Sequence, residues 1–323
     1  MQISRRAFLV AGAWMGLAAF AKAEERSHDV VVVGGSFAGL SAALQLVRAQ
    51  RRVLVIDAGK PRNRFARAMH GVLGQDGRTP QDFIAEATRQ LLAYPTVTIV
   101  SGLASAAKKE GLGFTVSTLD GRAYRASRLI LATGVKDELP DLDGLSSRWG
   151  VTVLHCPYCH GYEVKGQSLG VLASHALSVR QAALIPDWGP TTYFTQGICE
   201  PDQRVAAHLA ARGVVIERTP IVRLLGTAPG LEGVKLRDGR VIPLAAIFVV
   251  PKTTMASPLA EELGCEIEAG AVSPLLRTDA MKQTTVPGVY AAGDVVNFMQ
   301  KVAPAVSSGV LAGIGAHQSL LGG

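Results

Sequence analysis

Residues 29–57 read DVVVVGGSFAGLSAALQLVRAQRRVLVID, and this stretch decides the fold of the chain. The apolar run 29–33 is typical of a buried parallel strand. A glycine-rich turn and a helix-forming segment follow, and residues 53–57 form a second apolar run that ends in Asp57. The stretch therefore predicts a strand–helix–strand unit of about 30 residues.

The turn in this unit has the spacing of a dinucleotide-binding fingerprint. Small residues at three set positions let the chain leave the strand, let backbone N–H groups approach a pyrophosphate, and let helix and strand pack closely. Ser36 departs from the strict glycine pattern, but it is small. Asp57 stands where an acid would bind a ribose hydroxyl. The predicted contacts are Gly34, Ser36, Phe37, Ala38, Gly39, Asp57 and Ala58; the alternative is a glycine-rich turn without a ligand.

The rest of the chain alternates strands and helices in two blocks. A meander ends in a strand that runs into Ala132-Thr133-Gly134, and a second strand–helix series begins near residue 169. The tail returns with residues 288–294 and a helix rich in small residues. This order predicts an α/β protein with two Rossmann-like three-layer domains, one inserted into the other. The expected boundaries are 28–140 and 258–323 for the split domain and 145–251 for the inserted one.

The first 23 residues resemble an export signal. Arg5 and Arg6 precede an apolar run over residues 7–21, and Ala21-Lys22-Ala23 has the form of a cleavage site. The segment around the arginine pair resembles the twin-arginine signal, whose route carries folded proteins. We therefore expect a periplasmic or otherwise extracytoplasmic protein. The alternative is an N-terminal membrane anchor that is never cleaved.

The charge of the chain gives no support to nucleic-acid binding. The formal net charge is +7, and the first 23 residues contribute +3 of it, which leaves +4 for the mature chain. Basic residues do not form long runs beyond the pairs Arg51-Arg52 and Lys108-Lys109. We expect no nucleic-acid partner.

Residues 155–163 read HCPYCHGYE, in which Cys156 and Cys159 form a CxxC motif. The motif admits half of a zinc site, a structural disulfide or a redox-active dithiol. A zinc site would need a second ligand pair, but Cys199 and Cys265 lie far apart in the sequence, so no metal site is predicted. These two cysteines are either small buried residues or a second disulfide.

Four motifs in order resemble those of thioredoxin-reductase-like flavoproteins, within the pyridine nucleotide-disulfide oxidoreductases of class II. They are VVVGGSFAGLSAAL with Asp57, LILATG, CPYCHG and VPGVYAAGDVV, and the resemblance covers nearly all of residues 28–323. It implies that FAD is the cofactor and that the first unit holds the ADP part. Further implied contacts with FAD are His70, Ala132, Thr133, Gly134, Gly293, Asp294, Lys301, Val302 and Ala303.

The resemblance also implies roles for the CxxC motif. Cys159 would exchange electrons with the flavin, and Cys156 would exchange with the substrate. His160 takes the place of the acid that follows the second cysteine in thioredoxin reductases. The CxxCHG form is similar to that of dithiol oxidases from fungi and bacteria, which close disulfides in small dithiol natural products. His160 would be the catalytic base, or else a turn residue bonded to a backbone carbonyl.

One departure from the reductases concerns NADPH. After the strand that begins at residue 169, the three small positions fall on Ala173, His175 and Ser178, and none is a glycine. The next strand ends without an arginine pair that could hold a 2′-phosphate. NADPH is also a cytoplasmic metabolite. We therefore expect a degraded pyridine-nucleotide site.

The leading hypothesis is an exported FAD-dependent dithiol oxidase that acts through Cys156 and Cys159. Its substrate would be a small-molecule dithiol or a thioredoxin-like protein, and its electron acceptor oxygen or a quinone. The alternatives are an NADPH-dependent disulfide reductase and a flavin redox sensor without turnover. By analogy with the family we expect a homodimer.

Overall fold

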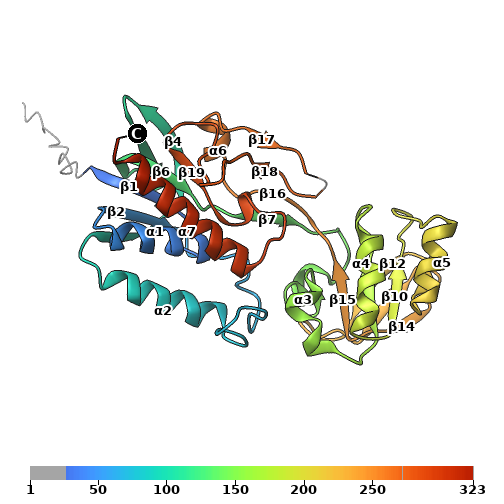
Figure 1. Cartoon of the computed structure of the whole chain (residues 1–323). Coiled ribbons are helices and arrows are strands. Elements are labelled where there is room, and N and C mark those ends of the chain that lie inside the picture. Colours follow the sequence, from blue (N-terminus) through green and yellow to red (C-terminus); the bar gives the residue numbers. More distant parts are fainter. Residues whose placement is uncertain (1–26, 271, 323) are drawn as a thin grey trace, which may run out of the picture.

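The computed structural model describes residues 27–270 and 272–322, which form two α/β units (Figure 1). An antiparallel pair of strands, β7 (Val135–Glu138) and β16 (Lys252–Met255), carries the chain out of the first unit and back. The predicted fold class, a nucleotide-binding α/β domain split by a second one, is confirmed. The predicted signal segment lies outside the described residues. Within them, no helix has the length and hydropathy needed to cross a bilayer.

The first unit is built on a sheet with the strand order β3-β2-β1-β6-β5-β4. Strands β3, β2, β1 and β6 are parallel to one another, and β19 pairs in parallel with the end of β6. Valines dominate β1 because β-branched side chains pack well on a pleated, buried surface. The bounds are β1 His28–Val33, β2 Val53–Asp57, β3 Val97–Ser101, β4 Ala104–Glu110, β5 Gly113–Thr118, β6 Ala123–Leu131 and β19 Val289–Ala291.

Two helices lie against one another on this sheet, α1 (Phe37–Arg48) and α7 (Val302–Ser319) (Figure 1). Their backbones approach closely because α7 presents glycines to α1. A methyl group on Gly309 would lie 2.2 Å from the carbonyl oxygen of Ala38, and one on Gly313 would lie 2.5 Å from that of Ala42. Helix α2 (Pro80–Leu92) packs beside α1. It begins at Thr79, whose hydroxyl accepts a hydrogen bond from the N–H of Asp82.

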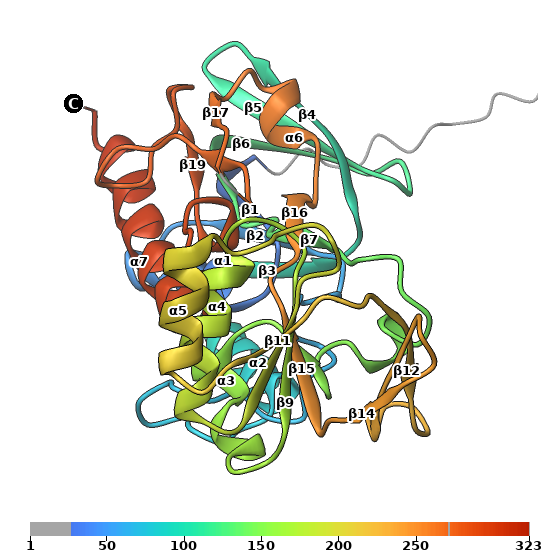
Figure 2. The same cartoon turned by 90° about the vertical axis from the view of Figure 1, so that its right-hand side faces the viewer.

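The inserted unit has a parallel sheet with the order β11-β10-β9-β15-β8. Figure 2 shows helices α4 and α5 on one side of this sheet and the small antiparallel sheet β12-β13-β14 on the other. The bounds are β8 Val153–Leu154, β9 Leu169–Leu172, α4 Ser178–Leu184, β10 Thr191–Phe194, α5 Gln203–Ala211, β11 Val215–Glu217, β12 Ile221–Leu225, β13 Gly233–Leu236, β14 Val241–Pro243 and β15 Ala246–Val249. The remaining elements are α3 Pro157–His160, α6 Leu259–Glu262, β17 Ile267–Glu268, β18 Leu275–Leu276 and the short 3-10 helices 146–148, 162–164, 185–187 and 293–295.

The sequence left open a second disulfide between Cys199 and Cys265, and this alternative is wrong. Both thiols are free. Cys265 belongs to the core of the first unit, whereas Cys199 packs against the core of the inserted one. The thiol of Cys265 lies 3.5 Å from the hydroxyl of Thr284, which makes it a buried structural residue.

Arg62 ties three segments of the chain together. Its guanidinium donates to both carboxylate oxygens of Asp137 on β7, to Asp294 at 3.0 Å and to the side-chain oxygen of Gln300 at 2.7 Å. Burial by itself lowers the pKa of Arg62, but the hydrogen bonds and charge of Asp137 reverse this and leave the pKa raised. Burial raises the pKa of Asp294, and Arg62 offsets part of that rise. We call Arg62, Asp137 and Asp294 the linker ion cluster.

The packing of α1 on α7 can be tested with Gly309→Ala. Alanine favours a helix over glycine by about 1 kcal/mol, but the added methyl group meets backbone that cannot rotate away. We expect the free energy of unfolding to fall by about 1–3 kcal/mol, measured by urea denaturation. The control is Ser307→Ala on the exposed face of the same helix. Equal stability of both variants would show that the helices separate without cost.

The linker ion cluster can be tested with Arg62→Leu, which leaves the largely buried carboxylates of Asp137 and Asp294 without their cation. Breaking a buried pair in this way costs about 3 kcal/mol. We expect a loss of this size in urea unfolding, and none in Arg64→Leu, because Arg64 is an exposed neighbour. If both variants unfold alike, the cluster contributes no net stability.

Candidate active site

The turn after β1 is so closely packed that its glycines cannot carry a side chain. Its backbone N–H groups can therefore be approached by the phosphates of a ligand. A methyl group on Gly34 (φ +107°) would lie 2.2 Å from the carbonyl oxygen of Ala132, and one on Gly39 would lie 1.8 Å from that of Gly34. In the described part of the chain, no acceptor receives the N–H groups of Ser36, Phe37 or Ala38 at the start of α1. Free N–H groups at a helix N-terminus form an anion site. The turn therefore fits the pyrophosphate of a dinucleotide.

The other predicted contacts for the ADP part gather around this turn. Asp57 ends β2, and its carboxylate accepts a hydrogen bond of 3.0 Å from the N–H of Gly35. Ala58 follows it on the surface. Ala132, Thr133 and Gly134 leave the end of the neighbouring strand β6, and the N–H of Ala132 donates to the carbonyl of Val33. Carboxyl ends of adjacent parallel strands form the crevice where doubly wound sheets bind ligands.

The remaining predicted contacts come from the tail of the chain. Gly293 adopts a φ of +85°, and its N–H donates to the hydroxyl of Ser308 at 2.9 Å. Asp294 belongs to the linker ion cluster. Lys301 directly precedes α7, and Val302 and Ala303 form its first residues. These residues lie close to the first turn, since a methyl group on Gly293 would contact Ala38 at 3.1 Å.

Three residues of this region were not predicted from the sequence: Arg62, Asn63 and Gln300. Arg62 and Asn63 lie on the irregular loop after β2, where no motif marks them. The side-chain oxygen of Asn63 is buried and has no hydrogen-bond partner among the described residues. A buried polar atom without a partner is costly, so it points to a missing ligand donor. Together with the free N–H groups of α1, this atom supports the fit of FAD to the first unit.

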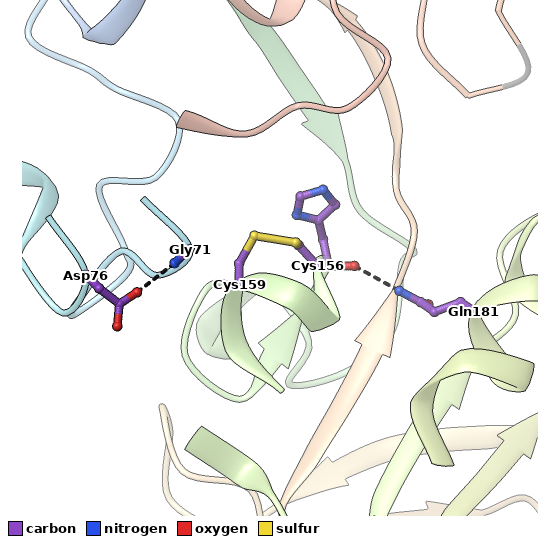
Figure 3. The surroundings of a disulfide bond; sticks show 6 residues. Gly71, Asp76, Cys156, Cys159 and Gln181 are labelled. Atoms are coloured by element: carbon purple, nitrogen blue, oxygen red, sulfur yellow. Dashed lines mark hydrogen bonds between the residues drawn. A yellow bond between two sulfur atoms is a disulfide. The ribbon is translucent and has the colours of Figure 1, made fainter. Parts of the chain in front are cut away.

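The CxxC motif lies in the inserted unit, where it faces a loop of the first (Figure 3). Cys156 and Cys159 form a disulfide across the start of α3, with their Cα atoms 5.3 Å apart. Figure 3 shows the disulfide between the loop that carries Gly71 and the helix that carries Gln181. Gly161 closes the motif because a side chain there would collide with Pro157 and with the ring of Trp188, at 2.7 Å and 2.8 Å.

Two histidines flank the disulfide, and burial keeps both neutral. Burial lowers the pKa of His160, although Glu163 raises it in part. Burial and the charge of Arg62 lower the pKa of His155 to about 3. A neutral imidazole can accept a proton from a thiol, and His160 has the pKa nearer to working pH.

His70 lies at the junction of the two units. Its Nδ1 is 3.5 Å from Asp76 on its own loop, and its Nε2 is 3.4 Å from Glu163 of the inserted unit. The structure thus places His70 between two carboxylates, beside the CxxC helix. Its predicted contact with the flavin stays a prediction.

A pocket of about 410 Å³ borders Cys156. One wall comes from α3 and α4 of the inserted unit, and the other comes from residues 298–301 of the first. Cys156 itself is only 6% exposed, and it lines this pocket. The volume falls within the range of small-molecule sites.

Comparison with known proteins agrees with this geometry. The model of the family described as pyridine nucleotide-disulphide oxidoreductase matches residues 28–176 and 198–309. Thioredoxin reductase sirT of Leptosphaeria maculans is 34% identical over 313 residues, with 91% of this chain and 94% of that protein covered. Thioredoxin reductase tcpT of Claviceps purpurea is 32% identical over 305 residues, with 91% and 94% covered.

Among solved structures, the oxidoreductase from Agrobacterium tumefaciens is 49% identical, with a TM-score of 0.88. That match covers 91% of this chain and 99% of the other. The motifs, the two nucleotide-type sheets and these relatives agree with one another. The chain belongs to the pyridine nucleotide-disulphide oxidoreductase family, and within it to the thioredoxin-reductase-like FAD oxidoreductases.

Proposed function

We propose that this protein is an FAD-dependent dithiol oxidase, which closes disulfides in its substrates and does not draw electrons from NADPH. The observation that carries the proposal is a contrast between two turns of the same chain. The turn after β1 has free N–H groups at the start of a helix and no side chain of the turn that accepts from them. In the corresponding turn after β9, side chains of Ser178 and His175 accept from the turn's own N–H groups.

The turn after β9 uses its own side chains as acceptors for three of its N–H groups. The N–H groups of Ser174 and His175 lie 3.0 Å and 3.4 Å from the hydroxyl of Ser178. The N–H of Leu177 donates to Nδ1 of His175 at 3.2 Å, and Nε2 of the same ring lies 3.0 Å from the carbonyl oxygen of Val250. A pyrophosphate would have to break these bonds and displace the imidazole. This arrangement supports a turn that has lost pyridine-nucleotide binding.

The disulfide can then be reduced only from the substrate side. A substrate thiolate attacks Sγ of Cys156, the Cys156–Cys159 bond breaks, and Cys159 leaves as a thiolate. The second substrate thiolate attacks its own mixed disulfide and releases Cys156, so two electrons pass to the enzyme. His160 takes up a proton from the attacking thiol. FAD, when bound, supplies the exit for the two electrons from the cysteine pair to oxygen or a quinone.

We propose further that the protein works outside the cytoplasm. The basis is the signal-like segment 1–23, with its arginine pair and its A-x-A site. A compartment without NADPH suits an enzyme whose second nucleotide turn is closed. It also suits a disulfide-forming activity, because disulfides persist there.

The proposal is tested by anaerobic titration of the purified flavoprotein, with the flavin absorbance as the readout. We expect DTT to bleach the flavin and NADPH to leave it oxidised. Either air, with formation of peroxide, or an added quinone should then restore the colour. Cys156→Ser and Cys159→Ser should each remove bleaching by DTT. Prompt bleaching of the flavin by NADPH would show that the protein is a reductase. If neither DTT nor NADPH bleaches the flavin, the result would favour a redox sensor.

The role of His160 predicts a specific pH dependence of kcat/KM. Its pKa lies below 6.5, so the imidazole is neutral at pH 7 and becomes charged only in acid. With a base that removes the thiol proton, kcat/KM should be level at neutral pH, and its fall in acid should lie on the acid side of the ordinary histidine pKa. In His160→Gln the rate at pH 7 should drop about 10²-fold and rise steadily with pH as the thiol itself ionises.

An unchanged plateau in His160→Gln would exclude His160 as the base. His155→Gln is the matched control. A group with a pKa of about 3 cannot cause a change of kcat/KM near neutral pH.

A further inference from the structure

The pocket beside Cys156 has a mixed lining that indicates what kind of dithiol it accepts. Helix α4 turns one face toward it, with Leu177, Arg180, Gln181 and Leu184 at helical spacing. Phe298 forms part of the opposite wall and is 80% exposed. An apolar group of a ligand would therefore be shielded from water between these walls.

The pocket is distinct from the cradle of the cofactor. Its lining includes neither the turn 34–39 nor residues 132–134, which surround the predicted pyrophosphate. Lys301 is the one residue shared between the pocket and the predicted FAD contacts. A molecule in the pocket would thus reach Cys156 without touching the turn that fits the pyrophosphate.

Two cations stand at this pocket without an acid beside them. Among the described residues, no carboxylate lies within ion-pair distance of Arg180 or Lys301. Lys301 instead lies over the ring of Tyr158, 4.6 Å from its centroid. Arg180 is exposed on α4 and has no hydrogen-bond partner in the described chain. A guanidinium in this position is suited to a carboxylate, which it can bind through two hydrogen bonds.

Gln181 adds an independent sign of a ligand. The residue is 93% buried, and its amide nitrogen donates to the carbonyl oxygen of His155 at 2.8 Å. Its amide oxygen is buried and has no partner in the described residues. Buried acceptors are normally satisfied, so a donor group of a bound molecule at this wall would complete it.

On the basis of the function proposed above, we propose that the pocket selects dithiols that carry a carboxylate on an apolar chain, and that Arg180 determines this selectivity. The carboxylate binds Arg180, the chain packs against Leu177 and Phe298, and the thiols meet Sγ of Cys156. Thiol–disulfide exchange then passes two electrons from the dithiol to the cysteine pair. A charged hydrogen bond of this kind corresponds to about a tenfold preference.

The test compares dihydrolipoate with dihydrolipoamide, which have the same dithiol and chain but differ in the carboxylate. With the FAD-loaded protein, we expect kcat/KM to be about tenfold higher for dihydrolipoate. Arg180→Gln should remove this difference by slowing dihydrolipoate alone, and should leave DTT and dihydrolipoamide within about twofold. The control is Arg204→Gln, an exposed arginine on α5 of the same unit that changes the net charge equally.

A binding measurement separates this inference from the proposed oxidase activity. By calorimetry on the resting disulfide form, lipoate should bind about tenfold more tightly than lipoamide, and Arg180→Gln should abolish the difference. Equal binding of both probes, or an equal loss in Arg204→Gln, would overturn the inference. If the preference for lipoate holds while no dithiol bleaches the flavin, the oxidase proposal fails and the pocket's selectivity stands.

Discussion

The structure depends on how closely helix α1 approaches the backbone around it. Gly39 packs against the carbonyl of Gly34 below, and Gly309 and Gly313 of α7 pack against the carbonyls of Ala38 and Ala42. These contacts hold the start of α1 at the carboxyl edge of the sheet, with three N–H groups unpaired. A helix end with free donors would be unfavourable in a closed core, and here it fits the pyrophosphate of a dinucleotide. The fold of the first unit and its binding site are therefore set by the same glycines.

The chain contains the same architecture twice, yet the two copies are equipped differently. Both have a parallel sheet with a turn from the first strand into a helix. In the second copy, His175 and Ser178 supply side-chain acceptors to the turn's own N–H groups. The turn of the second copy is therefore held by its own side chains, and the sheet, not a ligand, holds the inserted unit together.

The candidate active site lies where the two units meet. The disulfide comes from the inserted unit, whereas the loop with Gly71 and the segment 298–301 come from the first. The linker ion cluster holds strand β7 to both halves of the split unit. Any change in the angle between the units would alter the pocket beside Cys156 and the pairing of His70 with Glu163. The geometry of the site is thus a property of the junction and not of either unit alone.

Much of this protein could be predicted from local sequence. The apolar run 29–33, the spacing of Gly34, Ser36 and Gly39, and the acid at Asp57 are local patterns, because a strand–turn–helix is specified by neighbours in the chain. The CxxC motif and the missing glycines at Ala173, His175 and Ser178 are local in the same sense. From these residues the sequence determined the fold class, the family and the cofactor.

The tertiary structure alone decided which distant residues meet. Arg62 and Asn63 lie on a loop without periodicity, and their partners are far along the chain. Gln181 and Arg180 read in sequence as ordinary residues of a helix, and only the folded chain sets them opposite residues 298–301. Burial, ion pairing and pocket shape depend on contacts between segments far apart in sequence, which no local pattern records. The sequence therefore determined the fold class and the family, and the tertiary structure decided what surrounds the Cys156–Cys159 disulfide.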